Sequence, residues 1–252
     1  MSRALLTNPL LGGLPFSQLV ASLNPIGWYK LDESSGTVAF DSSTNGNDAD
    51  YLGPFALQGI KSRPGAATNG VLLDNFANVN VPYFVGTPLD VNASDHWTIH
   101  FWCRPTNDTA GSSLKALVSS RYSDFGGWAN YIISLGWNSL NMMQLTVTND
   151  GHNGATGQAQ DPGALVVDTT YCVSVRRNGG TLDIFKDDVL VDSDAWTGTG
   201  ASGTNPGFEI GGGGTFPTVY EYIGGAQDVV LFDYALSDAT LSQLYAKGLT
   251  TP

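Results

Sequence analysis

Short segments with alternating apolar and polar side chains recur along this sequence, and they constrain its fold more than any other feature. The clearest runs from Trp97 to Arg104, and another runs from Thr170 to Arg177. A period of two sends successive side chains to opposite faces of a β-strand. The 31 glycines and the charged fraction of only 13% suit many tight turns between such strands. We therefore expect an all-β fold. The expected faces of the first segment are Ile99, Phe101 and Cys103 on one side and His100, Trp102 and Arg104 on the other.

One short helix is expected behind the last strand. Ser237 is a suitable N-cap, Leu241, Leu244 and Tyr245 form an apolar stripe, and Gly248 is expected to end the helix.

Two connections between strands are predicted from their composition. Lys186 to Asp188 joins a hairpin, in which Asp188 must either adopt a positive φ or use another turn type. Asn149 to Pro162 is expected to be a long polar loop.

Residues 1–24 form an apolar arm that precedes the strand-rich body of residues 25–252. Pro and Gly interrupt the arm, so we expect it to be retained in the mature protein rather than removed as a signal peptide. Exposing so many leucines to water would be costly, so the arm packs either on its own domain or on a partner subunit. The candidate anchoring residues are Leu5, Leu6, Leu10, Leu11, Leu14, Phe16 and Leu19.

The overall charge excludes several kinds of partner. A net charge of −12 and a pI near 4.3 argue against binding nucleic acid or anionic membranes by electrostatic attraction. No apolar run approaches the ~18 residues that span a bilayer. Cys103 and Cys172 both lie in expected strands, where they form either a disulfide or two separate buried thiols.

A polar loop at Asp41 to Asp48 concentrates oxygen-bearing side chains within eight residues. Asn45-Gly46 favours a turn, because both residues tolerate positive φ. Such a loop can either bind a hard cation such as calcium or be held by its own side-chain-to-backbone hydrogen bonds.

Several segments resemble LamG-like domains of the concanavalin A-like lectin/glucanase superfamily. The resemblance implies a single antiparallel jelly-roll β-sandwich with an N-terminal arm and a short C-terminal helix. The segments that carry it are, in order, WYKLDESSGTVAFDSSTNGND from Trp28, GVLLDNFANVNV from Gly70, WTIHFWCRP from Trp97, TLDIFKDDVLV from Thr181, and Ile223 to Gly248.

The resemblance also implies a structural calcium ion where the polar loop meets the last strand. Its expected ligands are Asp41, Asn45, Asp48 and Asp228. Similar domains usually carry two acids at the strand, whereas here the first is Gln227, and the lost charge weakens calcium affinity.

No catalytic constellation is evident, so we expect a protein that is not an enzyme. The three glutamates, Glu33, Glu209 and Glu221, lie outside the E-x-D-x-x-E pattern of the superfamily's hydrolases. The three histidines lack metal-ligand spacing.

Sugar binding would use exposed aromatic faces beside amides and carboxylates. The candidates are Tyr122, Phe125, Trp128 and Trp137, with hydrogen bonds from Asp150 to Asn153. The alternative is that these aromatic residues belong to the core.

Three functions compete at this point. The first is a structural or decorating protein of a bacteriophage virion, assembled in the host cytoplasm. It would bind other virion subunits or itself through the arm, and host glycans are a further possible partner. LamG-like domains of phage virion proteins resemble the opening LNPIGWYKLDESSGT. The second is an extracellular, secreted or surface glycan-binding module. The third, a glycosidase, would need a carboxylate pair in a cleft.

Overall fold

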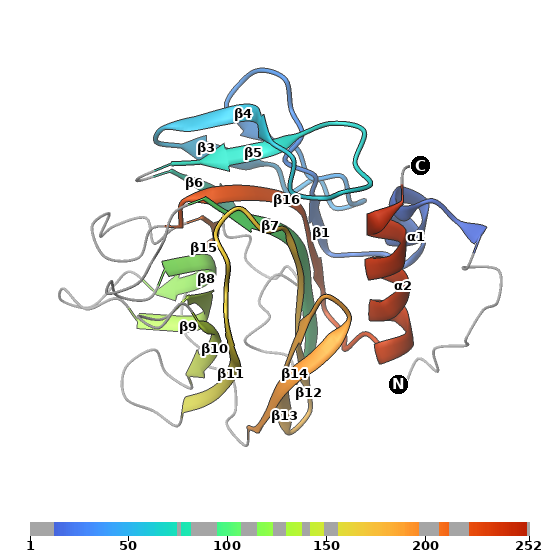
Figure 1. Cartoon of the computed structure of the whole chain (residues 1–252), viewed down its shortest axis with the longest axis vertical. Coiled ribbons are helices and arrows are strands. Elements are labelled where there is room, and N and C mark those ends of the chain that lie inside the picture. Colours follow the sequence, from blue (N-terminus) through green and yellow to red (C-terminus); the bar gives the residue numbers. More distant parts are fainter. Residues whose placement is uncertain are drawn as a thin grey trace.

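The computed structural model describes residues 13–74, 77–81, 95–106, 115–122, 130–137, 142–148, 156–196, 207–211 and 222–250. In these ranges, two antiparallel sheets pack face to face, and two helices lie outside one of them (Figure 1). The expected all-β sandwich with a short C-terminal helix is thereby confirmed. Neither described helix is long and apolar enough to cross a membrane.

The sheet beside the helices, called sheet A, has the strand order β14-β13-β12-β7-β16-β5-β4, with β1 also paired to β16. Its strands are β1 (Gly27–Tyr29), β4 (Phe55–Ile60), β5 (Gly70–Leu73), β7 (His96–Pro105), β12 (Tyr171–Asn178), β13 (Thr181–Lys186), β14 (Val189–Ala195) and β16 (Gly224–Phe232).

The facing sheet, called sheet B, has the order β11-β10-β9-β8-β15-β6-β3-β2. Its strands are β2 (Val38–Ala39), β3 (Ala49–Leu52), β6 (Asn78–Val81), β8 (Lys115–Tyr122), β9 (Asn130–Trp137), β10 (Met142–Thr148), β11 (Thr156–Ala164) and β15 (Gly207–Ile210).

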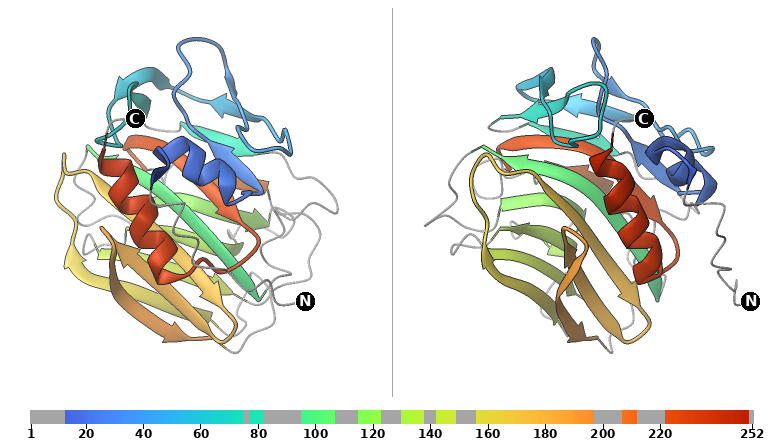
Figure 2. Two further views of the ribbon diagram at one scale, coloured as in Figure 1. Left: turned by 90° about the vertical axis from the view of Figure 1, so that its right-hand side faces the viewer. Right: turned by 45° about the vertical axis from the view of Figure 1, so that its right-hand side comes forward.

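The alternation that predicted β7 and β12 is confirmed by burial. Ile99, Phe101 and Val173 face the other sheet and belong to the apolar core between the sheets. The opposite face of β7 carries His100 and Trp102, which are also buried, because the helices cover this outer face of sheet A (Figure 2).

Cys103 and Cys172 are two separate buried thiols, as one of the two alternatives expected. Cys103 pairs with Tyr171 in the sheet, and Cys172 pairs with Trp102, so the two sulfur atoms lie on opposite faces. Burial raises the pKa of both thiols, which makes them poor nucleophiles.

The described end of the N-terminal arm folds over its own domain. Residues Phe16–Ser22 form helix α1, which packs beside helix α2 (Asp238–Leu249) on sheet A (Figure 2). Leu19 is fully buried and Phe16 is 4% exposed, in a cluster with Phe232 and Leu244.

The expectation that Phe16 and Leu19 anchor a partner is therefore wrong, because the chain's own core already covers both side chains. Leu14 packs partly against the same cluster. Leu5, Leu6, Leu10 and Leu11 lie outside the described residues.

Helix α2 begins where the sequence predicts, but Gly248 does not end it. The Ser237 hydroxyl accepts a hydrogen bond from the backbone N–H of Thr240 at 3.2 Å, which confirms the N-cap. Gly248 lies inside the helix, and a Cβ there would approach Trp102 Cζ2 to 2.3 Å. The glycine is thus required for close packing of the helix on the sheet.

Strand β11 replaces part of the loop that was expected from Asn149 to Pro162. Its inward positions hold small residues, since a Cβ on Gly157 would lie 2.5 Å from Trp196 Cε3. The apolar signal of a strand is therefore missing from the sequence. Pro162 is tolerated because β11 is an edge strand.

The β13–β14 hairpin uses a positive φ at Asp188, one of the two alternatives expected for this turn. Asp187 and Asp188 both have positive φ, 49° and 72°. This is the conformation that a two-residue hairpin loop favours.

Candidate functional site

Polar residues line up across the outer face of sheet B, which is turned away from the helices (Figure 1). The flanking positions Val79 and Val81 are buried in the core, which places Asn80 on the outer face. The pairing register then aligns one residue from each of seven strands, and we call this set the polar row. From β3 to β11 the polar row consists of Asp50, Asn80, Glu209, Ser119, Ser134, Thr146 and Gln158.

The polar row is accessible at its two ends. With strands about 4.8 Å apart, its six steps span about 29 Å. Ser119, in the middle, is fully buried. Asp50 is exposed and makes no ion pair or side-chain hydrogen bond with any described residue, whereas Asn80 and Glu209 are half-buried. We call Asp50, Asn80 and Glu209 the acidic end.

Exposed apolar side chains border the acidic end. Val38 pairs with Asp50, and Phe40 continues the outward alternation of β2 with 57% of its surface exposed. Leu52, next to Asp50 on the same face, is 46% exposed. The Phe40 backbone is fixed because its N–H donates to Glu33 Oε1 at 2.9 Å. An exposed ring beside carboxylates and an amide is an arrangement that suits sugar binding.

Two of the four aromatic residues predicted to bind glycans, Tyr122 and Trp137, lie far apart. Tyr122 pairs with Asn130 at one end of the β8–β9 hairpin, and Trp137 pairs with Lys115 at the other. Seven strand residues separate them by about 23 Å. Trp137 also pairs with Met143, which is buried in the core.

Phe125, Trp128 and the loop Asp150 to Asn153 lie outside the described residues. The sequence did carry a partial signal for the acidic end, because NVNV alternates polar and apolar residues, and ADYL and GFEI each place one acid between apolar or aromatic neighbours. It carried no signal that these three strands are neighbours.

The loop Asp41 to Asp48 is organised by its own hydrogen bonds, the second alternative expected for it. Asp41 Oδ1 accepts from the N–H groups of Trp28 and Ser43, both at 2.9 Å. Its Oδ2 accepts from the Ser43 hydroxyl at 2.8 Å and the Asn47 N–H at 2.9 Å. Asp48 Oδ1 accepts from the Asp41 N–H at 2.9 Å.

The remaining predicted calcium ligands are engaged elsewhere. Asn45 Nδ2 donates to the Ile26 carbonyl at 2.9 Å. Asp228 forms a buried ion pair in which Arg63 Nε donates to Oδ2 at 2.6 Å, and the Trp28 indole N–H donates to Oδ1 at 3.1 Å. Burial raises the pKa of Asp228, and the charge of Arg63 opposes this shift.

The described residues therefore do not fit a calcium ion in this arrangement, because hydrogen-bond donors already occupy both carboxylate oxygens of Asp41 and of Asp228. They also contain no group of three or more His, Cys, Asp and Glu side chains that could hold a metal. Calcium binding stays a prediction.

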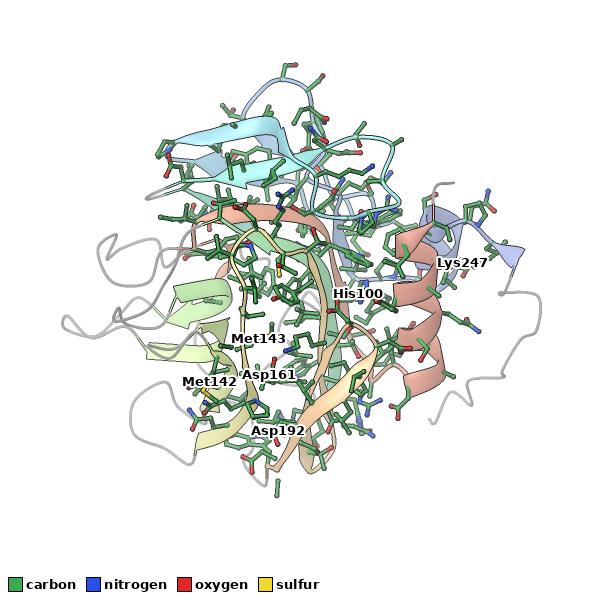
Figure 3. All side chains as sticks on the ribbon, in the orientation of Figure 1. His100, Met142, Met143, Asp161, Asp192 and Lys247 are labelled. Atoms are coloured by element: carbon green, nitrogen blue, oxygen red, sulfur yellow. The ribbon has the colours of Figure 1, made fainter. Side chains whose placement is uncertain are left out.

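A second polar cluster lies beneath helix α1 on the outer face of sheet A. His100 Nδ1 is 2.8 Å from the Ser174 hydroxyl, and its Nε2 is 4.0 Å from Cys172 Sγ (Figure 3). Burial, aided by the charge of Arg63, lowers the pKa of His100 to about 3. This neutral, fully buried imidazole has the environment of a structural residue.

The family model described as the concanavalin A-like lectin/glucanases superfamily (Laminin_G_3) matches residues 74–242, more than half of the chain. The chain belongs to the concanavalin A-like lectin/glucanase superfamily. No curated protein shows significant sequence similarity to this member of the superfamily.

Solved structures similar to this superfamily member include proteins described as bound to sialic acid derivatives. Trypanosoma rangeli sialidase in complex with 2,3-difluorosialic acid matches with a TM-score of 0.64 and 12% identity, over 90% of this chain and 33% of that one. The CBM40 of Ruminococcus gnavus IT-sialidase bound to α2,3-sialyllactose matches with a TM-score of 0.51 and 16% identity, over 61% and 84%.

The receptor-binding domain of the botulinum neurotoxin C/D mosaic serotype matches with a TM-score of 0.63 and 13% identity, over 88% and 51%. The superfamily member studied here thus spans about a third of the length of the trypanosomal sialidase. Identities this low show a shared fold and leave function to the site itself.

Proposed function

We propose that this protein is a non-enzymatic, extracellular glycan-binding module that uses the outer face of sheet B. The observation that carries the proposal is the acidic end of the polar row beside the exposed ring of Phe40. Carboxylates and amides hold sugar hydroxyls by hydrogen bonds, and an exposed aromatic ring offers an apolar surface to the sugar. Similarity to structures bound to sialyllactose and difluorosialic acid supports this reading.

The predicted virion role receives less support. Phe16 and Leu19, two of the seven residues expected to anchor a partner, are already buried in their own domain.

The absence of catalysis remains part of the proposal. Among the described glutamates, Glu33 accepts hydrogen bonds from the Phe40 N–H at 2.9 Å and the Tyr51 hydroxyl at 2.6 Å. These contacts give it a role in fixing strands β2 and β3. Asp228 is buried against Arg63, so it lacks the exposure to water that hydrolysis needs.

A glycan array followed by calorimetry tests the proposal. We expect the wild type to bind at least one class of oligosaccharide, and Asp50→Ala to weaken that binding about tenfold, the effect of losing one charge-assisted hydrogen bond. Asp233→Ala is the matched control, since Asp233 is exposed just before α2 on the opposite side of the sandwich. Absence of binding on the array, or equal losses in both variants, would contradict the proposal.

A further inference from the structure

The acidic end offers hydrogen-bond acceptors and negative charge to a ligand. Asp50 is exposed and unpaired among the described residues, and Glu209 lies two strands away across Asn80. An ionised carboxylate accepts hydrogen bonds and donates none. The ligand must therefore supply the donors.

Asn78 adds an unsatisfied acceptor to the same face. It precedes Asn80 by two positions on β6 and pairs with Leu52, so it shares the outer face with the acidic end. The residue is only 6% exposed, and its Oδ1 accepts no hydrogen bond from any described residue. A buried polar atom without a partner is costly and indicates a missing donor.

From these acceptors, we infer that the ligand is a neutral saccharide rather than a sialylated or otherwise anionic one. This inference rests on the proposed function and names the ligand class of its site. The hydroxyl groups of a neutral sugar donate to the acceptors of the acidic end, while its apolar ring face packs on Phe40. A sialic acid would instead bring a further carboxylate, an acceptor that carries like charge, towards Asp50.

A neutral ligand would distinguish this protein from its structural relatives. The trypanosomal sialidase and the Ruminococcus gnavus CBM40 were solved with sialic acid derivatives. The net charge of −12 adds a general repulsion for anionic glycans, which salt would screen.

Matched glycan pairs test the inference. Neutral oligosaccharides are compared by calorimetry, for binding to the wild type, with the same oligosaccharides carrying a terminal α2,3-linked sialic acid. We expect the sialylated form to bind about tenfold more weakly at low salt, with a smaller difference at high salt, because salt screens exposed charges. Asp50→Asn should narrow the difference, because it removes a negative charge while keeping an acceptor.

A variant of Arg121 tests the opposite outcome, in which the protein prefers the sialylated form. Arg121 pairs with Gly207 on β15, two positions along β8 from Ser119. The wild type could instead prefer the sialylated form, with that preference lost in Arg121→Gln and unchanged in Asp50→Asn. This result would overturn the neutral-ligand inference and leave the proposed function standing. Binding of neither form would overturn both.

Discussion

His100 makes the stability of the sandwich depend on pH. Its imidazole is fully buried, and burial lowers its pKa to about 3 in the folded protein, against an ordinary 6.5. In the unfolded chain the same group takes up a proton below its ordinary pKa. Protons thus bind the unfolded state more tightly, and His100 costs stability as pH falls from 6.5 towards 3.

The unfolding free energies of the wild type and of His100→Gln can be measured by urea denaturation at pH 7 and pH 5. From the linkage relation, the wild type should lose about 2 kcal/mol more than the variant between these pH values. His96→Gln is the control, since His96 is exposed on the same strand. Equal pH dependence in the wild type and His100→Gln would show that His100 does not titrate as its burial requires.

Asp192 and Asp194 connect an edge strand of one sheet to an edge strand of the other, on one side of the sandwich. Strand β11 is an edge of sheet B and β14 is an edge of sheet A. Asp192 Oδ2 accepts from the Gln160 N–H at 2.7 Å, and Asp194 Oδ2 accepts from the Gln158 N–H at 2.9 Å. Figure 3 shows Asp192 where these strands approach each other. The carboxylates thus satisfy backbone donors that an open edge would leave unpaired.

Replacing both aspartates with alanine should loosen β11. Each lost hydrogen bond is worth about 1 kcal/mol, so hydrogen exchange of the Gln158 and Gln160 amides should speed up about fivefold or more. Ser193→Ala is the matched control, because the Ser193 hydroxyl donates to Asp183 and faces away from β11. Unchanged exchange in the double variant would rule out this bridging role.

Elements with an apolar face could be predicted from the sequence, and elements without one could not. Strands β7 and β12 and the cap of α2 were predicted because burial leaves an alternation or a capping signal in the residues themselves. Strand β11 was missed, since Gly157 makes room for Trp196 and leaves no such signal. Gly248 was misplaced for a related reason, because the Trp102 that requires it is distant in sequence.

The candidate site is harder to predict than the elements that build it. Asp50, Asn80 and Glu209 come from strands up to 159 residues apart, and the pairing register alone brings them together. Two members of the predicted aromatic set, Tyr122 and Trp137, share a hairpin but lie at its opposite ends, which the sequence alone does not reveal.

The outer faces of sheets A and B differ in what covers them, and this difference indicates different roles. Helices α1 and α2 cover sheet A and bury Phe16, Leu19 and Leu244 there (Figure 2). The outer face of sheet B carries the polar row and the exposed ring of Phe40. The helix-covered face stabilises the fold, whereas the other face presents groups that can meet a ligand.

An NMR titration of the labelled, full-length protein with the oligosaccharide selected on the array would show which outer face binds the ligand. We expect chemical-shift changes to concentrate in the amides of β3, β6 and β15, around Asp50, Asn80 and Glu209, and to saturate with the calorimetric affinity. Amides of α1 and α2 should stay unchanged. Shifts concentrated on the helix-covered face, with β3, β6 and β15 unaffected, would contradict the assignment of ligand binding to the outer face of sheet B.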